Sequence, residues 1–445
     1  GRYASALVIV ELISQLCELG QRRGLAQRLS EDPRDATHVI SDAMTLSLML
    51  SLAAAGLLYL FPAPMFPSGQ YTEWDRLLPV ALVANALTDI ALAALAYRYN
   101  VGATVRARSV VEPWVQTLSV VAFLFVLPAA GLALSFILAK LAALVVAFWP
   151  LVRTYGLPRR WHPHPFRLGR LALLSAPLAV ADMVEWGSRK LDVALLGFFT
   201  SPAAVGVYYA AQQVASLPQK LKTSFEPILG PVITRNLKEK NYAAIAQQVS
   251  QVGFWIIAAQ AGIAMALAIP GEAVMGLVGP NFVGGTGALT FLLVAEVAAA
   301  TAVVSEAALI YVARHKNLWI SLSTIALQAA LTVGGMLAVR EMGLGPNYSA
   351  AAAAAALLLS LATASLVKAW LLSRILGERI ASWRWALVWA AAPAAVVGWA
   401  VTRFLPEWAE LMLGIPAILL TYGWVIWHRG FGPEDRVLFR RNVGG

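Results

Sequence analysis

The chain has 445 residues, of which 59% are hydrophobic and only 13% are charged, and its formal net charge is +10. This composition excludes an ordinary soluble domain and is typical of a protein built from membrane-spanning helices. The single cysteine, Cys17, lies in an apolar segment and excludes an intramolecular disulfide.

Apolar windows recur along the whole chain, each about 20 residues long, which is the length of helix that crosses a hydrocarbon core of about 30 Å. The fold class they predict is an all-α, polytopic membrane protein. In chain order the predicted spans are 3–19, 42–62, 77–97, 109–127, 132–152, 170–199, 204–233, 243–269, 285–313, 316–340, 346–373, 384–404 and 407–428.

The connections between these spans differ sharply in basic residues. One alternating set carries most of the Lys and Arg, whereas the other set carries only Arg76, Arg340 and Arg403. Because cytoplasmic loops are enriched in Lys and Arg, the basic set predicts the cytoplasmic side, and it includes the tail after Trp427. Topology therefore explains the positive net charge, and no nucleic-acid partner is needed.

An internal repeat relates the two halves. GRYASA at 1–6 matches GVYYAA at 206–211, and GLAQRL at 24–29 matches GPVITRNL at 230–237. Parallel repeats of this kind occur in transporters. We expect a five-helix N-terminal lobe at 1–152, lacking an upstream first helix, and a cytoplasmic linker at 153–167. A six-helix C-terminal lobe at 168–373, two further helices at 384–428 and a basic tail at 429–445 follow.

Four stretches carry a resemblance to a known family: DVALLGFFTSPAAVGVYYAA at 192–211, PQKL at 218–221, FEPILGP at 225–231 and VGPNF at 278–282. They resemble Wzx-type flippases for O-antigen, lipopolysaccharide and exopolysaccharide repeat units, of the multidrug/oligosaccharidyl-lipid/polysaccharide exporter superfamily. The resemblance implies two six-helix lobes around a central cavity that opens alternately. It also implies transfer of a polyprenyl-pyrophosphate-linked oligosaccharide across the bacterial inner membrane, without covalent chemistry.

Charged residues interrupt the spans after residue 170. Asp182, Glu185, Arg189 and Asp192 are spaced by 3, 4 and 3 residues and share one helix face, and Lys190 lies beside them. Since a charge near the bilayer centre costs about 2.5–3.5 kcal/mol, we expect this face to line a polar cavity. An intrahelical charge cluster that locks the helix to its neighbour is the alternative.

Further cations are predicted to bind the cargo's diphosphate. Lys220 and Lys222 lie in a span that Pro218, Pro227 and Pro231 are expected to break, and Lys140 has no charged neighbour in its own span. Together with Arg189 and Lys190 these lysines form the predicted cationic cavity. Lys368, near a helix end, is expected to reach the headgroups instead.

Acidic residues in the spans have open roles. Asp89, Glu112, Asp182, Glu185 and Asp192 are candidates to balance the cations, to bind sugar hydroxyls, or to carry a coupling proton or sodium ion. No other cofactor is expected. His162 and His164 in the linker have no third ligand nearby, so no metal site is predicted.

Two other functions compete with flipping. An antiporter for drugs or metabolites would share the architecture but is expected to have a more apolar, aromatic or acidic cavity. A membrane glycan polymerase or ligase would need a long outer loop, and none is predicted. The expected partners are the lipid-linked oligosaccharide, membrane lipids, and a polysaccharide polymerase and glycosyltransferases.

Overall fold

A computed structural model of the chain describes residues 2–21, 24–25, 28–29, 35–98, 100–127, 130–158, 161–432 and 435. Side chains are described in these ranges except at 101, 177–178, 180–182, 184–186, 188–189, 219–232, 234–235, 238 and 314. Every regular element within them is a helix, and no strand occurs there, which confirms the all-α prediction.

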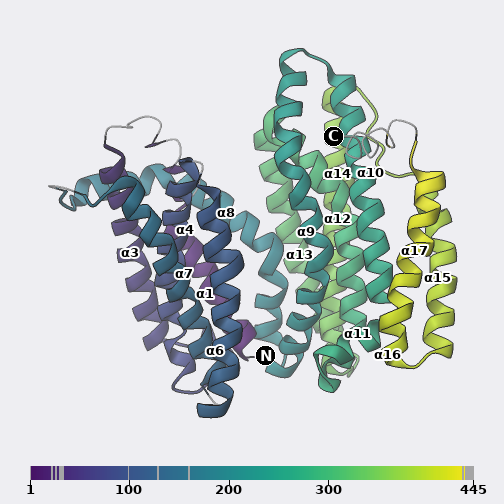
Figure 1. Ribbon diagram of the computed structural model, residues 1–445, viewed down its shortest axis with the longest axis horizontal. Helices are drawn as coiled ribbons and strands as arrows, with labels where there is room; N and C mark the ends of the chain where they lie inside the picture. Colours follow the sequence, from purple (N-terminus) through teal and green to yellow (C-terminus); the bar gives the residue numbers. More distant parts are fainter. Residues whose placement is uncertain are drawn as a thin grey trace. The chain divides into compact units, whose positions relative to one another are not determined.

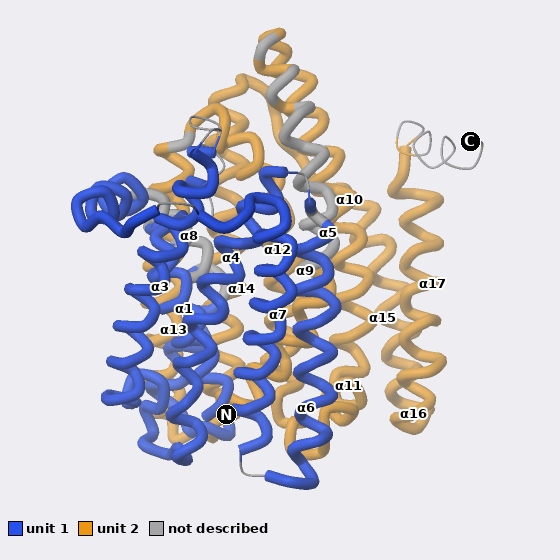
Figure 2. Tube along the Cα trace, turned by 60° about the vertical axis from the view of Figure 1, so that its left-hand side comes forward, with its two compact units in different colours: residues 1–203 blue, residues 204–445 orange. Residues whose placement is uncertain are grey.

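The chain divides into two compact units, Gly1–Ala203 and Ala204–Gly445, which are coloured separately in Figure 2. The helices of the first unit are α1 (Arg2–Glu18), α3 (Ala36–Leu60), η2 (Asp75–Leu77), α4 (Pro79–Tyr97), α5 (Val101–Thr104), the π-helical η3 (Val105–Val111), α6 (Glu112–Val126), α7 (Gly131–Tyr155) and α8 (Pro165–Phe199). The predicted C-terminal lobe begins at residue 168, whereas α8 packs against α1 in the first unit. The predicted lobe boundaries stay predictions.

Helix α4 is the central helix of the first unit and packs against α1, α3 and α7. Its buried positions alternate large and small side chains, such as Leu82, Ile90 and Ala94, which are fully buried. Small residues bring helix backbones close together, and dispersion contacts then hold the bundle in lipid. This packing places the polar residues of α4 inside the unit.

The second unit begins with long helices and ends with a helical pair. Its elements are α9 (Pro202–Lys238), α10 (Tyr242–Ala268), α11 (Gly271–Val278), η4 (Pro280–Gly285), α12 (Thr286–Val312), α13 (Arg314–Glu341), α14 (Pro346–Leu376), α15 (Ala386–Phe404), α16 (Glu407–Ala409), the π-helical η5 (Glu410–Gly414), α17 (Ile415–Val425) and the π-helical η6 (Ile426–Gly430). Figure 1 shows α15 and α17 in yellow as neighbours, and they pack on α10.

The alanine-rich stretch 349–359 forms the first half of α14, which packs against both α12 and α13. Ala353 and Ala354 are fully buried there, and Gly335 of α13 approaches the Ala352 side chain so closely that an added Cβ would lie 3.4 Å from it. Small side chains thus allow three helices to meet tightly, as expected for packing in a bilayer.

Ten helical stretches in the described part are long and apolar enough to cross a membrane, so the protein is a multi-pass membrane protein. The other three predicted spans, 3–19, 170–199 and 204–233, form α1, α8 and α9. The apolar flanks are widely exposed: Phe125 on α6 is 86% exposed, and Leu118 on the same helix is also exposed. Such a surface is stable only when lipid covers it.

The predicted interruption of the span at 204–233 is wrong. Helix α9 runs without a break from Pro202 to Lys238, through Pro218, Pro227 and Pro231. A proline removes a single backbone donor, and neighbouring helices can supply the missing partner. Separately, the buried Gln260 side chain of α10 holds α9 at this turn, because its Nε2 donates to the Pro218 carbonyl at 3.1 Å.

Candidate functional site

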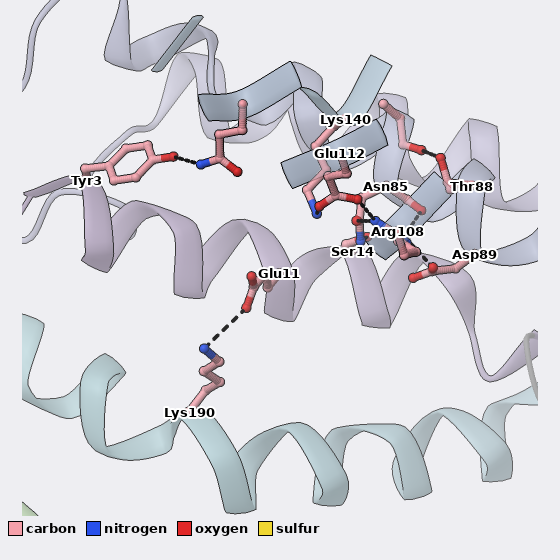
Figure 3. Close-up of polar contacts among 12 residues, drawn as sticks. Tyr3, Glu11, Ser14, Asn85, Thr88, Asp89, Arg108, Glu112, Lys140 and Lys190 are labelled. Atoms are coloured by element: carbon pink, nitrogen blue, oxygen red, sulfur yellow. Dashed lines mark hydrogen bonds and ion pairs between the residues drawn. The ribbon is translucent and has the colours of Figure 1, made fainter. Parts of the chain in front are cut away.

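Four helical elements of the first unit direct charged side chains toward one another (Figure 3). Asn85 and Asp89 are four residues apart on α4 and share its buried face. Arg108 lies on η3, Glu112 begins α6, and Lys140 lies in the middle of α7. We call Asp89, Arg108, Glu112 and Lys140 the unit 1 charge network.

Arg108 is the centre of the network. Its Nη1 donates to Asn85 Oδ1 at 2.9 Å and to Glu112 Oε2 at 2.8 Å, while its Nη2 forms an ion pair with Asp89. The guanidinium is planar and presents several donors in a fixed fork, which suits it to join two carboxylates from different helices. Arg108 lies in the π-helical segment at 105–111, which leads directly into α6. It therefore lies four residues before Glu112, the first residue of α6.

Lys140 joins the network from α7. Its Nζ lies 2.6 Å from Glu112 Oε1 and 5.2 Å from the centre of the Phe136 ring, and its side chain is only 9% exposed. Asn85 extends the network to α1, because its Nδ2 donates to Ser14 Oγ at 2.9 Å. Helices α1, α4, α6 and α7 are therefore joined through one continuous set of polar contacts.

The unit 1 charge network contains two carboxylates and two cations and is neutral when all four are ionised. Taking such charges out of water costs several kcal/mol per ion, so each requires a partner at close range. Removing one member would leave a buried charge uncompensated. An anion can therefore replace a carboxylate at Arg108 or Lys140 more easily than either cation can lose its partner altogether.

A second network occupies the second unit. Lys368 Nζ on α14 lies 2.8 Å from Glu306 Oε2 on α12 and donates to Ser321 Oγ on α13 at 3.2 Å. Asn317 Nδ2 donates to Glu306 Oε1 at 3.4 Å. The prediction that Lys368 reaches the headgroups is wrong, since its side chain is only 6% exposed and the Glu306 carboxylate on the neighbouring helix lies within reach of its ammonium group.

The two networks can be compared through the predicted repeat, which stays a prediction. In the first unit the acid Asp89 lies on α4 and the cations follow on η3 and α7. In the second unit the acid Glu306 lies on α12, the helix that the repeat aligns with α4, and the cation Lys368 lies on α14, which it aligns with α7. Equivalent helices thus carry carboxylate and ammonium groups in the same chain order.

The other predicted site residues lie elsewhere or outside the described part. Lys190 Nζ on α8 lies 4.0 Å from Glu11 Oε2 on α1 (Figure 3). Asp192 is fully buried, and its Oδ1 accepts the Val193 amide at 2.8 Å. The side chains that lie outside the described residues are those of Asp182, Glu185, Arg189, Lys220 and Lys222.

The structure therefore brings together three of the predicted site residues, Asp89, Glu112 and Lys140. Sequence reasoning missed Arg108, which lies in the connection between the predicted spans 77–97 and 109–127. The signal that would have found it is its spacing of four residues from Glu112, which places an Arg and a Glu on one helix face.

The linker is held to the first unit by Asp42 of α3. Its Oδ1 accepts from Trp161 Nε1 at 2.8 Å and from Arg167 Nη2 at 2.7 Å. His162 and His164 line a cavity of about 450 Å³ beside this contact. Among the residues described, no group of three or more His, Cys, Asp or Glu side chains is placed to hold a metal ion.

Comparison with solved structures identifies the fold. The chain is similar to the lipid II flippase MurJ in an inward closed conformation, with a TM-score of 0.70 and 12% identity, covering 96% of this chain and 92% of that one. It is also similar to an inward-facing multidrug resistance MATE family transporter of the MOP superfamily, with a TM-score of 0.67 and 15% identity, covering 84% and 92%. A third match, the Vibrio cholerae MATE transporter VcmN in its bent form, has a TM-score of 0.54 and 14% identity over 83% and 86%.

These similarities confirm the predicted fold class, and the matched structures are those of a flippase and of transporters. A search of curated protein sequences finds no match. The sequence model of one family, described as polysaccharide biosynthesis protein, matches residues 1–277, well over half of the chain. The protein thus has the fold of these structures, and it belongs to the polysaccharide biosynthesis protein family.

Proposed function

We propose that the protein is a flippase that moves a polyprenyl-pyrophosphate-linked oligosaccharide from the cytoplasmic to the outer leaflet of a bacterial inner membrane. Two observations support the substrate class: the family of the chain and its likeness to a lipid II flippase. The observation on which the mechanism rests is the unit 1 charge network, in which a half-buried Arg108 and a buried Lys140 lie between apolar helices with carboxylates as exchangeable partners.

The cargo's chemistry fits these cations. A pyrophosphate is a compact multiple anion, to which a guanidinium binds through a bidentate fork and an ammonium as a point charge. In the empty state Asp89 and Glu112 neutralise Arg108 and Lys140, so the site is stable in lipid without cargo. When the diphosphate binds, its oxygens replace the carboxylates at the two cations.

The displaced carboxylates provide a route to coupling. Once Glu112 and Asp89 lose their cationic partners, each requires a proton or a sodium ion to remain buried. Cargo binding and ion binding would then favour each other. Alternating access of the two lobes completes transfer, and no bond is made or broken.

The proposed cellular setting follows the distribution of basic residues. The C-terminal tail lies in the cytoplasm, on the side where glycosyltransferases assemble the oligosaccharide, and a polysaccharide polymerase receives it in the outer leaflet. Arg189, Lys190, Lys220 and Lys222 stay candidate cargo cations, and Asp182, Glu185 and Asp192 stay candidate counter-ions.

The test is the leaflet distribution of lipid-linked oligosaccharide in cells. It compares a deletion strain with strains that carry the wild type, the double variant Glu112→Gln with Lys140→Met, or the control Arg374→Ala, all at matched expression. The double variant removes one charge of each sign, so the network stays neutral and the fold is kept. Arg374 is exposed at the end of α14.

We expect the intermediate to accumulate on the cytoplasmic leaflet in the deletion strain and in the double variant, and not in the control. If the deletion leaves the distribution unchanged, the protein does not flip this lipid, and export of soluble small molecules becomes the better account. If the intermediate accumulates in the deletion strain but the double variant behaves like the wild type, the cargo does not use Lys140.

A further inference from the structure

A cavity of about 580 Å³ opens in the first unit, where η3 meets the last turns of α7. Its polar wall comes from Arg106 of η3 and from Arg153 and Thr154 of α7, together with Asn100. Its apolar wall includes Val145 and Trp149 of α7. None of these residues belongs to the unit 1 charge network, so the cavity is separate from the proposed cargo site.

The two arginines bring uncompensated positive charge to this cavity. Neither guanidinium forms an ion pair with a described residue, and no acidic side chain lines the cavity. Arg153 lies over the Trp149 ring, with 5.2 Å between the guanidinium carbon and the ring centre. A cation–π contact of this kind fixes the direction of the side chain without neutralising it. The cavity is therefore suited to an anion.

The apolar wall indicates what kind of anion fits. Val145 and Trp149 are 67% and 65% exposed, on a helix long and apolar enough to cross the membrane. These surfaces face lipid, while Arg153 lies two residues before the end of the helix at Tyr155. Tryptophan at a helix end marks the headgroup zone of the bilayer. The polar end of a ligand in this cavity would contact the arginines, and its apolar part would contact Val145 and Trp149.

We propose that this cavity binds the headgroup of an anionic phospholipid, with the lipid phosphate between Arg106 and Arg153 and an acyl chain along Val145 and Trp149. Predicted topology places it in the cytoplasmic leaflet. Arg106 and Arg108 lie on the same π-helical segment, one exposed at this cavity and the other in the unit 1 charge network. The bound lipid therefore holds in place the segment that positions Arg108.

The test uses the purified full-length protein and native mass spectrometry in a lipid titration. Phosphatidylglycerol is the anionic probe, phosphatidylcholine the neutral one, and inorganic phosphate tests whether a free anion suffices. The variant is Arg106→Ala with Arg153→Ala. The matched control is Arg374→Ala with Arg379→Ala, which removes the same charge and a similar stack, since Arg374 lies 5.4 Å from the Trp370 ring centre.

Each basic residue near an anionic headgroup contributes a factor of about five to binding. We therefore expect the affinity for the first phosphatidylglycerol to fall about 10- to 30-fold in the Arg106/Arg153 variant and less than about threefold in the control. Phosphatidylcholine binding should be equal in all proteins. Equal losses in both double variants would mean general surface attraction and would overturn the proposal. It would also be overturned if inorganic phosphate bound as tightly as the lipid.

Discussion

Arg108 shows how a single residue can determine the character of a membrane bundle. It lies in a predicted loop segment, yet it joins Asp89 on α4 to Glu112 on α6 and makes two half-buried acids tolerable. Lys140 then balances the second negative charge of the network. Ion pairs of this kind add little net stability, but the loss of one partner is expensive because the other stays buried.

Lys140→Met should therefore destabilise the protein by about 3–5 kcal/mol, because Glu112 keeps only Arg108 as a cationic partner. The double variant Glu112→Gln with Lys140→Met should recover most of this loss. The measurement is unfolding in mixed micelles, followed by circular dichroism.

The control is Glu73→Gln, which breaks the Arg76–Glu73 pair, where the carboxylate is almost fully exposed. It should change the unfolding free energy by less than about 1 kcal/mol. Equal effects of Lys140→Met and Glu73→Gln would show that the Lys140–Glu112 pair is not buried from solvent.

The sequence could predict part of this site. The spacing of Asn85 and Asp89 marks a polar stripe, and Lys140 requires a partner because its span has no other charge. The partner itself could not be derived, since Glu112 reaches Lys140 only through the packing of α6 on α7. The prediction for Lys368 was wrong for the same reason. A position near a helix end suggests that the side chain reaches the headgroups, but a carboxylate on α12 lies within reach.

At the level of elements, apolar windows predicted the helices well, because the length of a span is fixed by the bilayer. Helix ends were less predictable. The segment before α6 is already helical from Val101, with a π-helical turn, whereas the predicted span begins at 109. Proline was a poor guide to breaks in α9, because the helix continues through Pro218, Pro227 and Pro231.

Gly262 on α10 marks the close approach of α17. A Cβ added there would lie 2.9 Å from the Tyr422 ring, whereas one added at Gly334 on α13 would meet nothing within 4 Å. Gly262→Ala should thus destabilise the protein by about 1–3 kcal/mol relative to Gly334→Ala, which should be neutral or stabilising. Thermal unfolding of both variants measures the difference. Equal melting temperatures would mean that α17 moves freely on α10.

The chain after α17 is held by Asp435, a buried acid outside the spans. Its carboxylate accepts from Gln251 Nε2 at 2.8 Å, Trp255 Nε1 at 2.9 Å and Arg384 Nη1 at 2.9 Å, and from the Gly432 amide. Burial alone would raise the pKa of Asp435, but these hydrogen bonds outweigh it and the pKa is lowered. The docked chain therefore prefers the ionised acid.

A lowered pKa means that the docking stability is fully present above the undocked value of about 3.9 and is lost as pH falls through the lower, docked value. We expect hydrogen exchange of the Gly432 amide, corrected for intrinsic rates, to be constant from pH 7 to about 5 and to accelerate in stronger acid. In Asp435→Asn the amide should exchange faster at neutral pH, with no acid transition. Protection unchanged by this substitution would contradict the anchoring role.

At the scale of the whole molecule, the repeat stays a prediction from the sequence, and the charges of the two units can be compared through it. Matching helices in the two units carry an acid and a cation in the same order, Asp89 and Lys140 in one, Glu306 and Lys368 in the other. The similarity to a lipid II flippase extends over 96% of the chain at only 12% identity. The fold is thus specified by apolar patterning and small-residue packing, which many sequences satisfy.

The distribution of basic residues predicts the topology, which can be tested with single cysteines in a Cys17→Ala background. Ser68 lies in a connection predicted to be outside, and Glu378 in one predicted to be cytoplasmic; both are exposed. A membrane-impermeant maleimide should label Ser68→Cys in intact cells, and Glu378→Cys only after lysis. Labelling in the opposite order would invert the assignment.

The most direct test of the central claim is transfer of lipid by the purified protein alone. Proteoliposomes would carry a polyprenyl-pyrophosphate-linked oligosaccharide in both leaflets, and an added glycosidase would trim only the sugars exposed outside. If the protein flips this lipid, nearly all of the oligosaccharide should be trimmed in proteoliposomes with the wild type. With Glu112→Gln/Lys140→Met or in empty liposomes, only the oligosaccharide of the outer leaflet, roughly half, should be trimmed. Trimming that stops at the outer leaflet with the wild type, under a proton gradient and under a sodium gradient alike, would contradict the account.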